Sequence, residues 1–340
     1  MRFIITGGGT GGHLAIAEAL LEALRTRGHE AVFIGSVSGQ DRVWFEKGSS
    51  FARSWFLETT GVVNRRGFAK AAALWRIFTA FLQSRRIIKG YAPDAVVSVG
   101  GFSAAAASFA ALSLRVPLYI HEQNAVSGRL NKMLRPFAKA FFSSYDENSP
   151  VKGYPVSKIL FETARVRSGI KTIIFLGGSQ GARVINDLAL ELAPDLSGRG
   201  INIIHQCGER DYERVKAEYG KIGCDVELYG FTRELHSLLA RSDLAVSRAG
   251  ASTLWELCAN GLTAFFIPYP YAAGDHQYYN AKYLADMDLA WCKRESELKK
   301  EDILSLLNSD LSEKSRGVMA ICEEGAAESI IEFIERECAC

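Results

Sequence analysis

Two segments far apart in the chain follow one pattern, in which a short apolar run leads into a glycine-rich turn and then into helical periodicity. The first is RFIITGGGTGGH (residues 2–13) and the second is KTIIFLGGSQGARVIN (residues 171–186). A buried strand that enters a glycine turn and then a helix is typical of a parallel β-sheet with helices on both faces. The chain has 340 residues, which is enough for two such domains.

Further apolar runs follow each of the two segments and predict the remaining strands. They are residues 30–35, 94–101, 116–124 and 139–144 in the first half, and 201–208, 225–231, 243–250 and 263–270 in the second. Prolines and glycine interrupt the pattern in SPVKGYPVSK (149–158), where a domain boundary is expected. The sequence therefore predicts two doubly wound α/β domains, 1–154 and 155–340, with the last helix as a candidate to pack back on the first domain.

Composition excludes several classes of protein. The net charge of +2 does not predict the strongly basic face that nucleic-acid binding requires. The seven cysteines are scattered and show neither CxxC nor zinc-site spacing, so they are expected to be reduced thiols. No cluster of residues with metal-ligand spacing is apparent in the sequence, and no metal or cofactor is expected.

The glycines at positions 7, 9 and 12 spell GxGxxG, which raises the question of a dinucleotide site. Such a site also needs an acid at the end of the second strand to hold the ribose hydroxyls. The second strand here ends in Gly35 and Ser36, and the nearest acid is Asp41. An NAD oxidoreductase is therefore disfavoured. A glycine turn at a helix N-terminus suits another anionic ligand, or it is simply a turn that needs positive φ.

Polar side chains are expected where the predicted strands end. His13 directly follows the first glycine turn and could act as a general base near neutral pH, or bond to a neighbouring loop. Ligands of open α/β sheets bind beyond the carboxyl ends of the strands, so a cleft between the two domains is the expected site. The polar residues that cluster at these ends are Thr10, His13, Asn124, Ser179, Gln180 and Glu256.

Seven short motifs resemble, in the same order, those of the MurG family of bacterial glycosyltransferases. They are GGGTGGH (7–13), HEQN (121–124), GRLNK (128–132), GGSQGAR (177–183), HQCG (205–208), AGASTLWEL (249–257) and GDHQYYNA (274–281). The resemblance spans nearly the whole chain and implies a GT-B fold. It also implies transfer of GlcNAc, with inversion, from UDP-GlcNAc to the C4 hydroxyl of undecaprenyl-linked MurNAc-pentapeptide (lipid I), which forms lipid II for peptidoglycan.

The resemblance implies a role for each matching residue. Glu256 would hold the ribose hydroxyls, Gln277 the GlcNAc hydroxyls, and His13 would be the catalytic base. A helix that begins near Ser252 would point its positive end at the diphosphate. The remaining residues implied to bind UDP-GlcNAc or substrate phosphate are Thr10, Gly11, Gly12, Asn124, Ser179, Thr232, Ala251 and Thr253. Taken singly, several of these residue types are also common as helix caps or turn residues.

Residues 68–90 are the best candidate for membrane contact. Trp75, Phe78, Phe81 and Leu82 recur at helical spacing, and cationic residues accompany them, namely Arg76, Arg85, Arg86 and Lys89. This pattern suits an interfacial helix on anionic lipid, or a helix with its apolar stripe in the core. The resemblance implies peripheral attachment to the cytoplasmic face of the cell membrane.

Three features depart from the family pattern. The segment after His13 is a few residues shorter, Ser157 in GYPVS stands where the family has an arginine that helps to bind the nucleotide, and residues 100–111 lack a glycine–proline turn. Lys158 could replace that arginine only as a point charge. Three alternatives stay open: another UDP-sugar transferase, a UDP-GlcNAc epimerase, and a donor-binding protein with an impaired acceptor loop.

Overall fold

The computed structural model describes residues 1–46, 51–59, 68–178, 181–232 and 234–339, and it describes only the backbone of residues 68–72 and 74. The chain divides into two compact units. The first unit comprises Met1–Val156 and Gly325–Cys340, and the second comprises Ser157–Glu324. The C-terminal helix therefore belongs to the first unit, although the whole second unit precedes it in the sequence.

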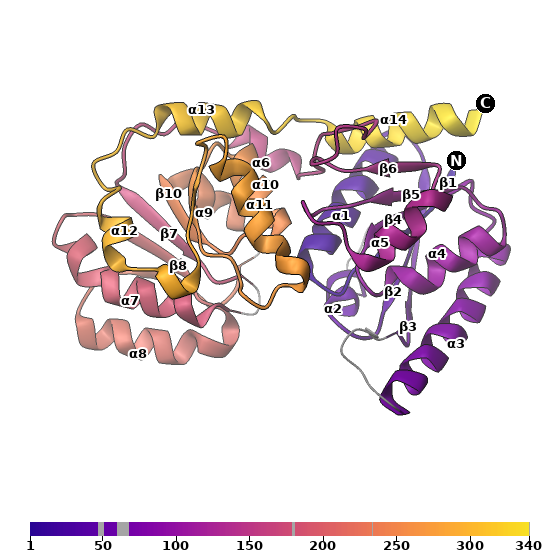
Figure 1. Cartoon of the computed structure of the whole chain (residues 1–340), viewed down its shortest axis with the longest axis horizontal. Helices are drawn as coiled ribbons and strands as arrows, with labels where there is room; N and C mark the ends of the chain where they lie inside the picture. Colours follow the sequence, from indigo (N-terminus) through magenta and orange to yellow (C-terminus); the bar gives the residue numbers. More distant parts are fainter. Residues whose placement is uncertain (47–50, 60–67, 179–180, 233, 340) are drawn as a thin grey trace. The chain divides into compact units, whose positions relative to one another are not determined.

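The first unit is built on a parallel sheet with strand order β3-β2-β1-β4-β5-β6 (Figure 1). Its strands are β1 (Arg2–Gly7), β2 (Glu30–Ser36), β3 (Arg53–Leu57), β4 (Ala95–Gly100), β5 (Leu118–His121) and β6 (Ala140–Phe142). The chain order reverses beside β1, which pairs with β2 on one side and β4 on the other. Ligands of doubly wound sheets bind in the crevice at such a reversal point.

Helices cover this sheet and account for the apolar character of its strands. They are α1 (Gly11–Thr26), α2 (Asp41–Phe45), α3 (Phe68–Tyr91), α4 (Ala104–Ser113), α5 (Arg129–Leu134), the short 3₁₀ turn η1 (Arg135–Phe137) and α14 (Ala326–Ala339). All six residues of β4 are buried. A parallel strand covered on both faces has no polar face, so its sequence is a continuous apolar run.

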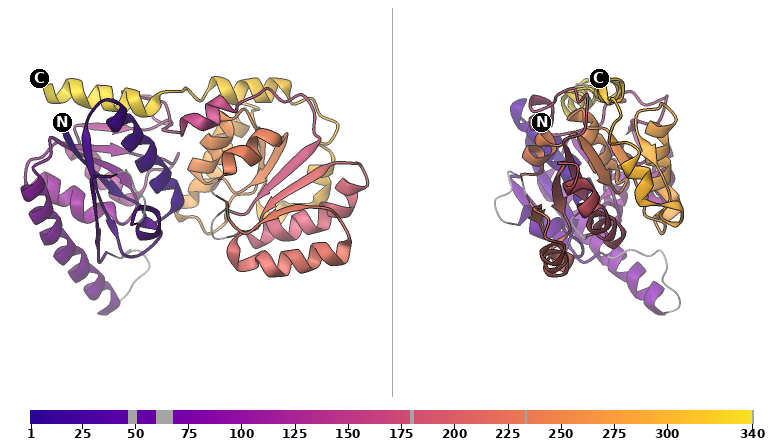
Figure 2. Two further views of the ribbon diagram at one scale, coloured as in Figure 1. Left: turned by 180° about the vertical axis from the view of Figure 1, so that it is seen from behind. Right: turned by 90° about the vertical axis from the view of Figure 1, so that its left-hand side faces the viewer.

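Ion pairs fasten the C-terminal helix α14 to α1. Arg27, at the end of α1, lies 2.6 Å from Glu335 and 2.9 Å from Glu332, both on α14. His29 forms a further hydrogen bond to Glu335. The Arg27 guanidinium and His29 hold the pKa of the Glu335 carboxyl well below its usual range, at about 2. Figure 2 shows α14 lying along the first unit.

The second unit repeats the architecture with strand order β9-β8-β7-β10-β11-β12, also wholly parallel. Its strands are β7 (Thr172–Leu176), β8 (Asn202–Gln206), β9 (Glu227–Tyr229), β10 (Leu244–Ser247), β11 (Ala264–Phe266) and β12 (Trp291–Cys292). The order reverses beside β7, which pairs with β8 and β10. The second glycine turn follows β7 and therefore occupies the position that the first one occupies after β1.

The second unit carries helices on both faces of its sheet. They are α6 (Lys158–Glu162), α7 (Arg183–Ser197), α8 (Tyr212–Ile222), α9 (Leu235–Arg241), α10 (Ala251–Ala259), α11 (His276–Ala285), α12 (Lys300–Leu304) and α13 (Ser312–Ala320), with 3₁₀ turns η2 (Glu209–Asp211), η3 (Ala273–Asp275) and η4 (Glu295–Glu297). Helix α7 places Ile185, Leu188 and Leu192 in the core. These positions recur at three and four residues, as expected for a helix that covers a sheet.

The strands expected from apolar runs are all present, and most are shorter than their runs, whereas β2 extends one residue beyond its run. The sequence analysis missed β3 and β12. Both are edge strands: the three middle residues of β3 are only half-buried, and β12 has two residues. Neither of these two strands has the continuous buried apolar run on which the predictions depended.

Candidate active site

The first glycine turn surrounds a carboxylate that belongs to the chain itself. Asp41 is fully buried; its Oδ1 accepts a hydrogen bond from Gly9 N at 2.5 Å and its Oδ2 accepts one from Ser36 N at 2.8 Å. Burial raises the pKa of this carboxyl above its usual value. A backbone N–H that could have met a nucleotide phosphate is thus already bonded to an internal acid.

The close approach of Asp41 explains why the turn needs glycine. A Cβ at Gly8 would lie 2.5 Å from Asp41 Oδ1, and a Cβ at Gly35 would lie 2.9 Å from Oδ2. Gly8 and Gly9 also have φ of +146° and +89°, which L side chains rarely adopt. The first glycine turn therefore packs around Asp41, which agrees with the argument against a dinucleotide site.

His13 lies in the first turn of α1, next to the reversal point of the first sheet. Its Nδ1 is 2.9 Å from Thr10 Oγ1, and its Nε2 is 2.9 Å from the amide nitrogen of Gln123. Gly100, at the end of β4, leaves room for the ring, since a Cβ there would lie 3.3 Å from Nε2. The predicted base and the predicted phosphate contact Thr10 are therefore bonded to each other.

A buried glutamate organises the loop that follows β5. Glu122 accepts hydrogen bonds from Asn124 N at 3.0 Å, from Gly128 N at 2.9 Å and from Asn131 Nδ2 at 2.9 Å. The predicted ligand Asn124 also directs its side-chain amide to Glu122, at 3.5 Å. The sequence analysis quoted the HEQN motif but assigned no role to Glu122 or Gln123.

His121 is a neutral residue that lies close enough to His13 to interact with it electrostatically. It is fully buried, and neither of its ring nitrogens has a hydrogen-bond partner in the described part of the chain. Burial, with a smaller effect from His13, lowers the pKa of His121 to about 3. His121 therefore places no positive charge beside His13 at neutral pH.

In the second unit, helix α10 begins at Ala251, one residue before the position expected from the sequence. Ala251, Ser252 and Thr253 form its first turn, where backbone N–H groups point out of the helix end. Glu256 follows one turn later and is half-buried. Burial raises the pKa of Glu256 to about 7, and a hydrogen bond with the Ser252 side chain opposes that shift.

Gln277 and Thr232 take part in local turns. Gln277 Oε1 accepts a hydrogen bond from Tyr269 N at 3.0 Å, and Thr232 Oγ1 accepts one from Glu234 N at 3.0 Å. The Gln277 amide nitrogen and the Thr232 backbone are the groups that would face a ligand. Ser179 and Gln180 lie outside the described residues.

Two residues of the HQCG motif connect the loops at this end of the second sheet. The Gln206 amide donates to Gly178 O at 3.2 Å and to Gly230 O at 3.3 Å, which joins the turns after β7 and β9. His205 bonds to Tyr219 at 2.9 Å and to Asn186 at 3.0 Å. Burial lowers the pKa of His205 to about 3, so this histidine is a neutral structural group.

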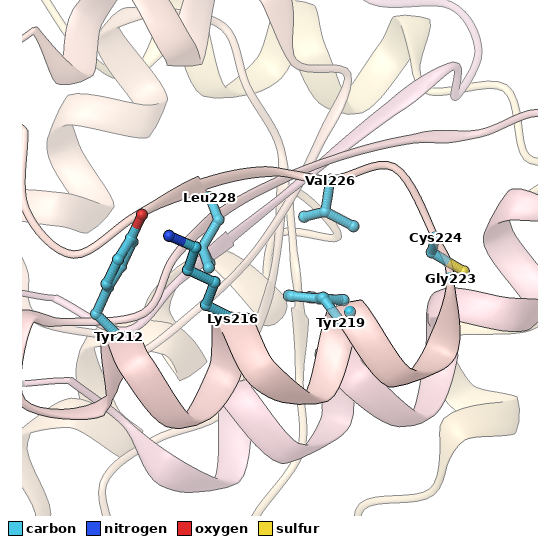
Figure 3. Close-up of a pocket in the computed structure, with 8 residues that line it drawn as sticks. Tyr212, Lys216, Tyr219, Gly223, Cys224, Val226 and Leu228 are labelled. Carbon is cyan, nitrogen blue, oxygen red and sulfur yellow. The ribbon is translucent and has the colours of Figure 1, made fainter.

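A hollow of about 320 Å³ opens between α8 and β9, lined among others by Tyr212, Lys216 and Tyr219. Figure 3 shows Tyr212 and Lys216 along one side of it, with Val226 and Leu228 opposite. It contains none of the residues expected to bind the donor. Within the described residues, no group of three His, Cys, Asp or Glu side chains could hold a metal ion.

Comparison with known proteins decides the family. Residues 3–143 match the N-terminal domain of glycosyltransferase family 28, and residues 172–333 match its C-terminal domain. A protein of Sulfurimonas denitrificans is 60% identical over 331 residues, which are 97% of each chain. It is named UDP-N-acetylglucosamine--N-acetylmuramyl-(pentapeptide) pyrophosphoryl-undecaprenol N-acetylglucosamine transferase. The chain belongs to the MurG family of glycosyltransferases.

Solved structures support the MurG assignment and the fold. The crystal structure of Acinetobacter baumannii MurG superposes with a TM-score of 0.79 at 28% identity, over 98% of this chain and 99% of that one. A UDP-GlcNAc 2-epimerase from Neisseria meningitidis superposes with a TM-score of 0.64 at 13% identity, over 99% of this chain and 100% of that one, which shows a shared fold alone. The predicted MurG resemblance and GT-B architecture are confirmed.

Proposed function

We propose that this MurG-family chain transfers GlcNAc from UDP-GlcNAc to the C4 hydroxyl of lipid-linked MurNAc-pentapeptide, with inversion at the anomeric carbon. The observation that carries the proposal is the 60% identity to a transferase named for this reaction, over 97% of both chains. The placement of His13 at the reversal point of the first sheet supports it, because a reacting group is expected there.

The second unit is proposed to bind the donor. A carboxylate accepts hydrogen bonds from two adjacent hydroxyls, which suits Glu256 to the ribose. The first turn of α10 offers N–H groups and a positive dipole end to the diphosphate, whose charge grows as UDP leaves. The other donor contacts proposed here are Ser179 with the phosphates or nucleoside, the Thr232 backbone with uracil, and Gln277 with the GlcNAc hydroxyls.

The first unit is proposed to bind the acceptor and to supply the base. The acceptor C4 oxygen attacks the anomeric carbon, the bond from that carbon to the UDP oxygen breaks, and UDP leaves with the bonding electrons. The proton of the attacking hydroxyl passes to a ring nitrogen of His13. Thr10, Gly11, Gly12 and Asn124 are proposed to contact substrate phosphate or the donor from this unit.

The direct test mixes the purified chain with labelled UDP-GlcNAc and lipid-linked MurNAc-pentapeptide, and counts label in the lipid product. Label in the lipid supports the proposal and shows that the short segment after His13 and Ser157 are compatible with transfer. Binding of UDP-GlcNAc without transfer would instead identify a donor-binding protein. A matched Ser157→Arg variant tests whether the arginine found elsewhere in the family improves donor affinity.

The raised pKa of Glu256 predicts how donor affinity depends on pH. The free protein holds this carboxyl partly protonated near pH 7, whereas two ribose hydroxyls are best accepted by the ionised form. Affinity for UDP-GlcNAc, whose diphosphate has no group that titrates in this range, should therefore rise with pH, by up to about tenfold per pH unit well below that pKa. Calorimetry in buffers of different ionisation enthalpy should show proton release on binding near pH 6.5.

The matched variant for this prediction is Glu256→Gln, which keeps the shape of the side chain and removes its titration. Its affinity for UDP-GlcNAc should be weaker than that of the wild type at pH 8 and nearly independent of pH between 6 and 8. An unchanged affinity at pH 8 would show that Glu256 does not contact the donor.

The exposed face of α3 is proposed to contact the membrane. Trp75, Phe78 and Leu82 have 66%, 49% and 41% of their surface exposed, and they lie three and four residues apart on one face. Arg86 and Lys89 continue that face. Phe81, the fourth residue of the predicted stripe, is partly buried: it packs against the core cluster that contains Ala80 and Ile88, and its ring also stacks on Phe78.

This arrangement favours an interfacial helix over a core helix, because its large apolar side chains face outward beside cations. The N-terminal turns of α3 also extend past the rest of the first unit (Figures 1 and 2). None of the helices in the described ranges is long and apolar enough to span a bilayer. Attachment is proposed to be peripheral, on the cytoplasmic face of the cell membrane.

Substitution of Trp75 and Phe78 by glutamate should weaken binding to anionic vesicles by roughly tenfold or more, because two apolar groups no longer insert. Co-sedimentation with phosphatidylglycerol vesicles measures the effect. Val43→Glu is the matched control, since Val43 is an exposed apolar residue on α2 of the same unit. If the double variant and the control bind the vesicles equally, α3 is not the part of the chain that contacts the membrane.

A further inference from the structure

The amide of Gln123 lies over the face of the His13 ring. Its nitrogen is 2.9 Å from His13 Nε2 and 3.4 Å from Nδ1. An atom on the in-plane lone pair of Nε2 would lie on the side of the ring away from Nδ1 and could not approach both nitrogens this closely. The amide N–H groups therefore point at the π electrons, a contact that stabilises neutral imidazole.

The oxygen of the same amide makes no hydrogen bond within the described residues. Gln123 is only 8% exposed, and its Oε1 has no hydrogen-bond partner in the part of the chain that the structure describes. A buried acceptor without a donor is costly. Rotation of the amide by half a turn would place Oε1 over the ring without breaking any bond that Oε1 makes.

The other charged or titratable groups near His13 are either neutral or already hydrogen-bonded to other residues. From β5, His121 is neutral because of burial. After β5, the Glu122 carboxylate is already bonded to two backbone N–H groups and to Asn131. From α2, Asp41 is bonded to Gly9 and Ser36. Gln123 is thus a polar neighbour that contacts the ring and still has an oxygen without a hydrogen-bond partner in the described residues, as Asn131 also does with its Oδ1.

We propose that Gln123 is a positioning residue whose amide follows the protonation of His13. Its NH₂ group lies over the neutral ring before reaction, and its carbonyl oxygen rotates into the same place when the ring gains a proton and becomes a cation. This inference rests on the proposed function, in which His13 takes the proton of the acceptor hydroxyl. It adds a group that favours the neutral base before attack and the imidazolium after it.

Gln123→Glu tests the inference with a readout that a merely structural role would not move. A fixed carboxylate beside the ring stabilises the imidazolium at all times, so the acid limb of the kcat profile should move to higher pH by about one unit or more. ¹⁵N NMR of the histidine-labelled full chain should show the same shift for the His13 ring, identified by its absence in His13→Ala.

Gln123→Met removes both amide groups while keeping the length of the side chain. It should lower kcat by about tenfold, because the imidazolium loses the negative end of the amide dipole over its ring, with the KM for UDP-GlcNAc unchanged. Gln123→Asn, which keeps the amide, should recover part of this loss. Thermal midpoints and UDP affinity of each variant confirm that it is folded.

The outcomes separate this inference from the function on which it rests. If His13→Ala turns over like the wild type, the proposed base is wrong, whatever Gln123 does. If His13→Ala is inactive while Gln123→Glu leaves both the NMR titration and the kcat profile unchanged, the inference is overturned and the function stands. A wild-type kcat in Gln123→Met would also overturn it.

Discussion

Replacement of His13 by alanine should lower kcat by about 10²–10⁴-fold, which is the usual contribution of a positioned general base. Affinity for UDP-GlcNAc should change little, because the proposed donor contacts Glu256 and Gln277 lie in the other unit. Steady-state kinetics with lipid acceptor gives kcat, and calorimetry with UDP gives donor affinity.

Two further measurements distinguish a lost base from a disturbed turn. Added imidazole should restore part of the turnover of His13→Ala, because a small base can enter the space that the side chain vacates. His13→Asn, which keeps a polar group near Thr10 without a basic nitrogen, should be as slow as the alanine variant. A variant that loses donor affinity in proportion to kcat would argue that His13 serves binding rather than proton transfer.

The architecture of both units could be predicted because it depends on local pattern. Continuous apolar runs that end in glycine identify parallel strands and their turns, since such strands are covered on both faces. The start of α10 was expected near Ser252 from the resemblance to the MurG family, and the helix begins one residue earlier. Glu256 then falls one turn into that helix.

The side-chain arrangement could not be predicted, because it depends on contacts between distant segments. Asp41 was noted only as an acid too far along the chain for a ribose, whereas the β2–α2 loop brings it back to Gly9. Gln123 was quoted within a motif and given no role, since its position over His13 follows from the packing of β5 beside β4. Periodicity likewise placed Phe81 with Trp75 and Phe78, but it could not show that Phe81 also packs against the core of the first unit.

The largest stability effect is expected at Arg167, a guanidinium that is 1% exposed in the second unit. It donates to Arg165 O at 2.7 Å, Leu239 O at 3.0 Å, Ser242 O at 3.1 Å and Asn260 Oδ1 at 2.6 Å, and it also bonds to Asn260 O. Burial lowers the pKa of Arg167 to about 9, which leaves it charged at neutral pH.

The fold tolerates the buried charge of Arg167 because its guanidinium lies at the C-terminal ends of two helices. Leu239 and Asn260 lie at the C-terminal ends of α9 and α10, where unbonded carbonyl groups give a partial negative charge. One planar guanidinium satisfies several of these carbonyls at once. Lysine has three donors on a single nitrogen and cannot span the same acceptors.

Arg167→Met should therefore destabilise the second unit by about 3–5 kcal/mol, as expected when one partner of a buried charged network is removed. Arg167→Lys should cost nearly as much. The matched control is Arg165→Met, because Arg165 bonds to the neighbouring carbonyls of Ala240 and Ser242 and to the Asp243 carboxylate but is partly exposed, so its loss should cost less, about 1–2 kcal/mol. Urea denaturation gives the free energies of unfolding, and hydrogen exchange at β7 and β10 assigns the change to this unit.

If Arg167→Met and Arg165→Met destabilise the unit equally little, the buried guanidinium is not what joins α9 and α10. The carbonyl groups at the ends of these helices must then find donors elsewhere.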